Sequence, residues 1–334
     1  GRGFLARLFC DQARLTFVDR DRTLIDRLNG AGGYEVRFFD GSPAVRIAGY
    51  RACHVDSHEA AAAVAACDAV LVSVRGENAA AAGAWLIDRL PGPTGVVACE
   101  NAAEPARLFP PPLCDSAASG AVFCTSVEDG PLDIRSERYP SLVVSERGAT
   151  PALRSLRGVE VTPDFGVLMK RKLYTYNAAS GIIAYLGAAA GHADYAAAAN
   201  DPRIERALDR FYAAINEAVC AEYGVDRREQ AEFAAASKRK FQNRAIVDTI
   251  GRNAASPERK LGATERIVAP MRLIAAHGGD ASVLYDTAAA ALRYAGAGTR
   301  AQAVEILGRS SGLEPGDRQF QAIVHRFGER EAGV

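Results

Sequence analysis

Two patterns of apolar and polar residues follow one another along this chain. Up to about residue 157, short continuous apolar runs alternate with amphipathic stretches, which predicts strands separated by helices. From residue 158 onward the pattern is helical throughout. This order is typical of an α/β domain, here residues 1–157, followed by an all-α domain over residues 158–334. The predicted strands cover residues 14–19, 34–39, 44–55, 68–74, 94–99, 121–127, 132–137 and 141–145, and the predicted helices of the second domain cover 163–187, 203–223, 227–241, 245–251, 264–277, 283–295, 300–308 and 315–327.

Most of these strands are expected to join one parallel sheet, because strands that alternate with helices pair in parallel. Residues 34–39 and 44–55 are interpreted as a small β excursion, and the last predicted strands as closing the main sheet. Residues 106–119, which contain three consecutive prolines, are predicted to form a loop.

Polar residues follow three of the predicted strands, where parallel sheets bind their ligands. Asp19 and Arg75 stand at two such ends, and Asn101 follows a third. Asp19 comes 18 residues after Gly1, close to the spacing of about 20 that separates the glycines of a dinucleotide fingerprint from the ribose-binding acid. We therefore predict a Rossmann-like domain that binds NAD through Gly1, Asp19, Val74 and Arg75. Turn or helix-capping roles for Asp19 and Asn101 stay open.

The second domain opens with a helix that is apolar on most of its sides. Thr162 can cap this helix and Pro163 fits its first turn. A helix of this kind is predicted to be buried. Lys172, Asn177 and Ser180 lie within it, and in an α-helix the last two stand roughly 140° and 80° round from Lys172. All three can therefore face one cavity.

Lysine is scarce in this sequence, with five lysines (170, 172, 238, 240 and 260) among 40 basic residues. An ammonium in a dry pocket can lose its proton near neutral pH, whereas a guanidinium cannot. Lys172 is therefore a candidate general base. The alternative is that residues 170–172 form a solvated turn of helix.

Composition excludes several classes of protein. The chain has 334 residues, of which 49% are hydrophobic and 24% charged, with no net formal charge, so a disordered or nucleic-acid-coating protein is excluded. No apolar run or signal-peptide pattern predicts a membrane span or secretion. The seven cysteines lack CxxC spacing and the five histidines are isolated, which predicts reduced thiols in a cytoplasmic protein and no metal site. The oligomeric state stays open.

Several segments match, in order, the motifs of one family. These are residues 1–4 (GRGF), 16–19, 98–101 (ACEN), 171–177 (RKLYTYN), 184–187, 191–192, 241–243, 248–252 and 259–261. The set resembles the mannitol dehydrogenase family of long-chain, metal-independent polyol dehydrogenases, most closely its mannitol-1-phosphate 5-dehydrogenase branch. The first strand and first two glycines of that family's nucleotide fingerprint are not in this sequence, so we expect it to be N-terminally incomplete.

The resemblance implies roles for individual residues. It makes Lys172 the general base, and it makes Asn177 and Asn101 the donors that polarise the reacting oxygen during hydride transfer to NAD. The implied reaction interconverts a polyol or polyol phosphate of the mannitol-1-phosphate type and its ketose. Arg252 and Lys260 are candidate contacts to the substrate's phosphate or hydroxyls, or else surface charges. Ser180, which stands where the family has a histidine that contacts substrate hydroxyls, is a third candidate substrate-binding residue.

Three departures from the family bear on the substrate. Ser180 replaces a histidine, residues 126–130 lack an arginine, and residues 253–257 carry about three extra positions. Two other hypotheses therefore stay open. One is a sugar-acid reductase of the same family that acts on a hexuronate-type ketose. The other is a non-catalytic nucleotide-binding relative, against which the retained lysine and asparagines argue.

Overall fold

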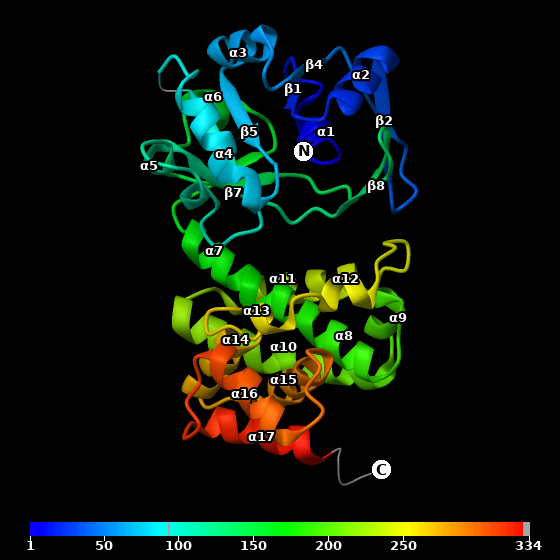
Figure 1. Cartoon of the computed structure of the whole chain (residues 1–334), viewed down its shortest axis with the longest axis vertical. Coiled ribbons are helices and arrows are strands. Elements are labelled where there is room, and N and C mark those ends of the chain that lie inside the picture. Colours follow the sequence, from blue (N-terminus) through cyan, green and yellow to red (C-terminus); the bar gives the residue numbers. More distant parts are fainter. Residues whose placement is uncertain (93, 330–334) are drawn as a thin grey trace. The chain divides into compact units, whose positions relative to one another are not determined.

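The computed structural model of this chain describes residues 1–92 and 94–329. The chain divides into two compact units, Gly1–Met169 and Lys170–Val334, and each is described by itself. The first is an α/β unit and the second is helical (Figure 1). The predicted domain boundary at residue 157 precedes one more strand, β11 (Val159–Thr162), which pairs with β10 (Leu142–Ser145) in a sheet of the first unit.

The largest sheet has the strand order β11-β10-β7-β6-β5. Its strands β5 (Ala69–Val72), β6 (Gly95–Ala98) and β7 (Ala118–Ala121) pair in parallel, and β7 pairs with β10 in antiparallel fashion. Every residue of β6 is buried, which is why this strand reads as a continuous apolar run. The helices and turns of the first unit are α1 (Leu5–Phe9), α2 (Arg22–Ala31), α3 (His58–Ala65), α4 (Gly76–Ile87), η1 (Pro105–Leu108), α5 (Leu113–Ser116) and α6 (Pro151–Ser155).

The strands outside this sheet correct two of the predictions. β4 (Arg51–His54) was assigned to a β excursion, but it pairs in parallel with β1 (Thr16–Asp19). The strand predicted at 132–137, here β9 (Asp133–Ser136), does not close the main sheet. It belongs to a four-stranded sheet of order β3-β2-β9-β8, with β2 (Gly33–Phe38), β3 (Val45–Ala48) and β8 (Ser126–Gly130). Local hydrophobicity predicts where strands occur but not which strands pair, because pairing depends on the tertiary fold.

The predicted strand at 121–127 and the predicted loop at 106–119 also differ from the structure. β7 ends at Ala121 and β8 begins at Ser126, because the chain leaves one sheet and enters another between them. Phe123 is buried in this crossing and stacks on Tyr139, with 5.8 Å between the ring centroids. The supposed loop contains η1, α5 and the beginning of β7.

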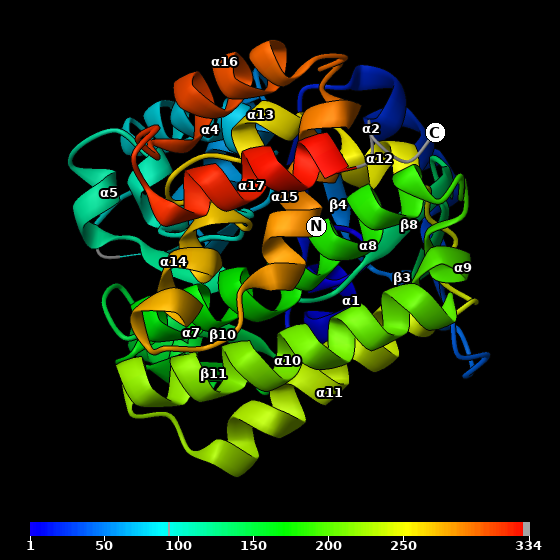
Figure 2. The ribbon, with the colours of Figure 1, turned by 90° about the horizontal axis from the view of Figure 1, so that it is seen from below.

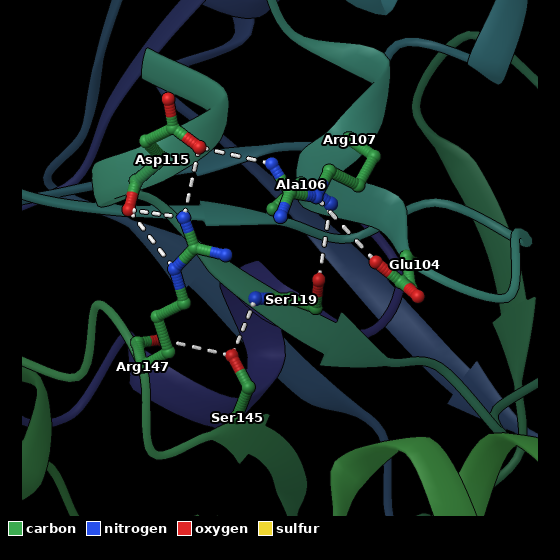
Figure 3. A network of polar contacts seen from close by, with 7 residues as sticks. All are labelled: Glu104, Ala106, Arg107, Asp115, Ser119, Ser145 and Arg147. Atoms are coloured by element: carbon green, nitrogen blue, oxygen red, sulfur yellow. Dashed lines mark hydrogen bonds and ion pairs between the residues drawn. The ribbon is translucent and has the colours of Figure 1, made fainter. Parts of the chain in front are cut away.

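A polar network holds the segment that follows β6 (Figure 3). The backbone N–H of Ala106 in η1 donates to Ser119 Oγ at 3.0 Å, and the N–H of Ser119 in β7 donates to Ser145 Oγ at 2.9 Å in β10. In the exposed part of this network, the carboxylate of Asp115 accepts hydrogen bonds from Arg107 at 2.9 Å and from Arg147 at 3.0 Å. These bonds tie η1 to two strands and so restrain the chain just after Asn101.

Helices form the whole second unit, apart from the loops between them. α7 (Phe165–Lys172) continues through a π-helical turn, η2 (Leu173–Asn177), into α8 (Ala178–Ala189). The remaining helices are α9 (Tyr195–Ala199), α10 (Pro202–Tyr223), α11 (Arg227–Gln242), α12 (Ile250–Ala254), α13 (Pro257–Lys260), α14 (Val268–Ala276), α15 (Ser282–Tyr294), α16 (Arg300–Ser311) and α17 (Arg318–Glu329). The helix predicted at 245–251 begins only at Ile250, because Thr249 pairs with Asp194 in an isolated β-bridge and caps α12 with its side chain.

α8 is the buried helix that the sequence predicted. It packs against α9, α10, α12 and α15, and Figure 2 shows it next to the long pair α10 and α11. Ile182, Ile183 and Tyr185 are fully buried, and the Tyr185 hydroxyl donates to the carbonyl of Ala254 at 3.1 Å. Gly187 allows the close approach of its neighbours, because a Cβ there would lie 2.8 Å from the side chain of Ala198.

Candidate active site

A π-helical turn separates Lys172 from Asn177. The N–H of Ala178 donates to the carbonyl of Leu173, five residues earlier, which is the hydrogen bond of a π-helix. Such a turn contains more residues than an α-helical turn, so it reduces the angle between a residue and the fifth residue after it. The separation of about 140° expected from an α-helix is therefore wrong, and Lys172 and Asn177 fall on the same side of the helix. Single π-turns inside α-helices often mark functional sites.

Contacts with α11 fix the rotation of this helix. Gln230, which is fully buried, accepts from Arg171 Nε at 3.1 Å and donates to Thr175 Oγ1 at 3.1 Å. The Arg171 guanidinium also donates to Glu229 at 2.7 Å and lies over the ring of Phe233, 4.8 Å from its centroid. Because Arg171 and Thr175 are held against α11, the side of the helix that carries Lys172 is set as well.

Lys172 is buried, with 6% of its surface exposed. Burial lowers the pKa of Lys172 to about 8, and the positive charges of Lys240 and Arg266 act in the same direction. The alternative interpretation of residues 170–172 as a solvated turn is therefore wrong for two of the three, since Arg171 is also buried and Lys170 alone is exposed. An amine with a pKa near neutrality can act as a general base.

Three further residues of this region were not predicted from the sequence: Tyr195, Lys240 and Arg266. Tyr195 begins α9, and its pKa is raised by burial and lowered in part by the Ser180 hydroxyl. The Arg266 side chain passes α8 at Gly181, where an added Cβ would lie 3.6 Å from Arg266 Cδ. The scarcity of lysine pointed equally to Lys240, but no local signal distinguishes Tyr195 or Arg266 from other tyrosines and arginines.

Of the three candidate substrate contacts, Ser180 lies in α8, and Arg252 and Lys260 lie on two short helices that follow one another in the chain. Arg252 in α12 forms an ion pair with Asp248, to which both its Nε and its Nη2 donate. Lys260 in α13 is buried, with 5% of its surface exposed, and its ammonium donates to the carbonyl of Asn253. Burial lowers the pKa of Lys260 to about 8, assisted by Arg266. A role for either residue in binding substrate stays a prediction.

In the first unit, a buried glutamate joins the ends of β5 and β6. The Glu100 carboxylate accepts from the backbone N–H of Val74 at 2.6 Å, and the Val74 carbonyl accepts from the side chain of Asn78 at 2.8 Å. Arg75, the next residue, has φ 67° and ψ 142°, a strained conformation for a residue with a side chain. The sequence analysis placed Glu100 within a motif but gave it no role. Glu100 links the loop after β5 to the end of β6, and it immediately precedes Asn101.

The predicted cofactor residues lie at the carboxyl ends of the strands of the first unit. Asp19 ends β1, where its Oδ1 accepts from the N–H of Asp21 at 3.0 Å. Gly1 lies at the end of β5, with its nitrogen 3.2 Å from Ser73 Oγ. Val74 and Arg75 follow β5 and immediately precede α4 (Gly76–Ile87). All four predicted positions therefore lie at or beside the carboxyl end of a strand. Of the predicted catalytic residues, Asn101 belongs to this unit and Lys172 and Asn177 to the second.

Comparison with known proteins places this arrangement in one family. Residues 166–319 match the mannitol dehydrogenase C-terminal domain. The chain is 29% identical over 342 aligned residues to mannitol-1-phosphate 5-dehydrogenase from Paenarthrobacter aurescens (strain TC1), which covers 94% of this chain and 89% of that protein.

Two solved structures share the fold. The crystal structure of D-sorbitol dehydrogenase in substrate-free form has a TM-score of 0.73 at 14% identity, covering 96% of this chain and 87% of that one. The ternary complex of Pseudomonas fluorescens mannitol 2-dehydrogenase with NAD and D-mannitol has a TM-score of 0.70 at 15% identity, covering 96% and 86%. Residues 166–319 therefore belong to the mannitol dehydrogenase C-terminal domain family, and the chain as a whole, an α/β unit followed by a helical one, is similar to mannitol dehydrogenases in sequence and fold. Over residues 1–92 and 94–329, no helix is long and apolar enough to cross a membrane.

Proposed function

We propose that this protein is an NAD-dependent oxidoreductase that interconverts a polyol or polyol phosphate, of the mannitol-1-phosphate type, and the corresponding ketose. The observation that carries the proposal is the state of Lys172, an amine buried beside two other cations and with its pKa lowered to about 8. Loss of hydration on burial favours the neutral form of this amine. It is suited to accept and return a proton.

The chemistry follows from the side chains present. In the direction of oxidation, the substrate hydroxyl gives its proton to Lys172 Nζ while its carbon gives up a hydride, which leaves a carbonyl. The amide groups of Asn101 and Asn177 donate to the oxygen as negative charge develops on it, in the manner of an oxyanion hole. Bound NAD supplies the hydride acceptor. General-base catalysis of this kind contributes about 10²–10⁴ in rate.

The first unit has the donor and acceptor groups that a dinucleotide requires. Asp19, held at the end of β1, can accept hydrogen bonds from ribose hydroxyls. The loop at Val74 and Arg75 leads into the N-terminus of α4, whose free N–H groups favour phosphate oxygens. Gly1 adds no side chain beside this loop. These residues fit NAD by their chemistry.

The test is steady-state kinetics with the full chain. The panel contains mannitol, mannitol 1-phosphate, fructose, fructose 6-phosphate and tagaturonate, each with NAD(H) and NADP(H). Reduction of NAD by a polyol or polyol phosphate, lost in Lys172→Ala, supports the proposal. If the folded protein bound NADH but turned over no member of the panel, the proposed function would be overturned. Activity with tagaturonate alone would assign the sugar-acid reductase instead.

A further inference from the structure

Two of the buried donors in the second unit that have no hydrogen-bond partner of good geometry among the described residues lie close to one another. They are the hydroxyl of Tyr195 and the Nε of Arg266. Tyr195 is 5% exposed and the Arg266 side chain 13% exposed, so water does not readily replace the missing partners. An unsatisfied buried polar group destabilises the folded protein, because its hydration is lost without replacement. Such groups are retained where a ligand completes them.

The two donors lie beside consecutive residues of α8. Tyr195 is a neighbour of the Ser180 hydroxyl, and Arg266 crosses the helix at Gly181, the next residue. The backbone N–H of Tyr195 donates to the carbonyl of Asp248 at 3.1 Å, which fixes the start of α9. The charge of Arg266 acts on the pKa of both Tyr195 and Lys172, so the two donors lie in the surroundings of the candidate base.

The charge around Arg266 is incompletely balanced. Its Nε lies 3.7 Å from Glu265 Oε2, which is too long for a hydrogen bond, and Glu265 is itself engaged by Arg259 at 2.6 Å. Lys172 and Lys260, both buried, add positive charge nearby, and their pKa values are lowered in part by Arg266. Buried cations are costly unless an anion compensates them.

We propose that Tyr195 and Arg266 bind a terminal oxyanion of the substrate, either the phosphate of a polyol phosphate or the carboxylate of a sugar acid. The inference rests on the proposed oxidoreductase function, and it states that the substrate is an anion. The Arg266 guanidinium offers the planar fork that suits phosphate and carboxylate oxygens. Lys260 supplies a second charge. Arg252 is less suited, because two of its nitrogens already donate to Asp248.

The proposal is tested with Arg266→Met, Arg266→Lys and Tyr195→Phe in the full chain. For the anionic substrate we expect Arg266→Met to raise KM by about 10- to 100-fold, the range for loss of a charge-assisted hydrogen bond. Arg266→Lys should recover part of this loss, and the Kd of NAD should not change. The matched control is Arg228→Met, an exposed arginine on α11 that pairs with Glu232, which should leave KM unchanged. An equal rise in KM for mannitol and mannitol 1-phosphate would overturn the proposal.

Tyr195→Phe distinguishes a binding role from a structural one. Because the Tyr195 hydroxyl has no hydrogen-bond partner of good geometry among the described residues, its removal should raise the melting temperature while it raises KM for the anionic substrate. The matched control is Tyr212→Phe, since the Tyr212 hydroxyl is also buried but bonds to Ser237 Oγ at 2.6 Å. That variant should lower the melting temperature and leave KM unchanged. A lower melting temperature for Tyr195→Phe with no change in KM would contradict the proposal.

Calorimetry with inorganic phosphate and with glucuronate, without turnover, separates this inference from the proposed function. Binding of either anion that is weakened by Arg266→Met supports an oxyanion site even if no substrate of the panel reacts, and the anion that binds identifies the class. If the protein oxidises a polyol but binds neither anion through Arg266, the oxidoreductase proposal stands and the oxyanion site is wrong.

Discussion

The carboxylate of Glu100 accepts a 2.6 Å hydrogen bond from the backbone N–H of Val74 and so couples the ends of two adjacent strands. On one side of this bond lies Arg75, with its positive φ, and on the other lies Asn101. Burial raises the pKa of Glu100, while the Val74 N–H acts in the opposite direction. The hydrogen bond from Val74 to Glu100 stabilises the strained loop at Arg75, next to the candidate catalytic residue Asn101.

We therefore expect Glu100→Ala to weaken NAD binding by about 5- to 100-fold, because it leaves the Val74 N–H unpaired at a cost of about 1–3 kcal/mol. Glu100→Gln keeps an acceptor oxygen, so it should weaken NAD binding less than Glu100→Ala does. Isothermal titration with NAD measures both. Glu104→Ala, which removes an exposed partner of Arg107, serves as the control, and an equal loss in that variant would refute a specific role for Glu100.

Lys172→Ala should reduce kcat by about two to four decades and leave the Kd of NAD nearly unchanged. Lys172→Arg should be almost as inactive, because a guanidinium keeps its proton. The control is Lys170→Ala, which changes an exposed lysine of the same helix. A Lys172→Arg variant with near-normal kcat would show that position 172 needs only positive charge.

The pH dependence of oxidation follows from the protonation of Lys172. Its pKa is lowered to about 8 by burial and then by Lys240 and Arg266, and oxidation needs the neutral amine. The kcat/KM for oxidation should rise with pH and level off above about 8, whereas that for ketose reduction should fall over the same range.

Removing one of the neighbouring charges should move this profile. Lys240→Gln takes away a cation that lowers the pKa of Lys172, so the rise in kcat/KM should shift to higher pH. Lys238→Gln is the matched control on the same helix, because Lys238 is paired with Glu205 and Asp209. Identical profiles for the wild type and Lys240→Gln would mean that another group titrates.

Cofactor preference should depend on Asp19. Its carboxylate can accept bonds from the adenosine ribose and repels a 2′-phosphate, so NAD should have the higher kcat/KM. Asp19→Ser should reduce the ratio of kcat/KM with NAD to kcat/KM with NADP. Asp21→Ser is a suitable control, since Asp21 caps α2 through the N–H of Leu24 and serine can do the same. A wild type that prefers NADP would contradict the assignment.

Gln230 should matter for stability as well as for catalysis. Gln230→Leu removes the bonds to Arg171, Thr175 and Asn216, and we expect a loss of about 2–4 kcal/mol in the free energy of unfolding. Urea denaturation measures this loss. Glu232→Gln, at an exposed position of the same helix, should change it by no more than about 0.5 kcal/mol. A kcat unchanged in Gln230→Leu would argue against a positioning role for this contact.

Local patterns in the sequence were sufficient for much of the fold. The apolar run at Val96 and Val97, the capping residues and the nearly uniform hydrophobicity of α8 each depend on neighbours within a few residues. The order of motifs was likewise enough to indicate the family. The strands before Asp19, Arg75 and Asn101 end within three residues of these side chains, as the sequence predicted, because the alternation of strand and helix indicates which end of each strand faces the loops.

Only the tertiary structure decided which strands pair and which charges are buried. β4 pairs with β1 and β9 with β2, pairings that hydrophobicity cannot specify. Lys172 is buried, and the adjoining Arg171 is held by Gln230 of α11, some sixty residues later in the chain. Tyr195 and Arg266 reach α8 from segments that share no motif with it. Periodicity describes the faces of one element, whereas the protonation of a lysine depends on whatever packs against it from elsewhere in the chain.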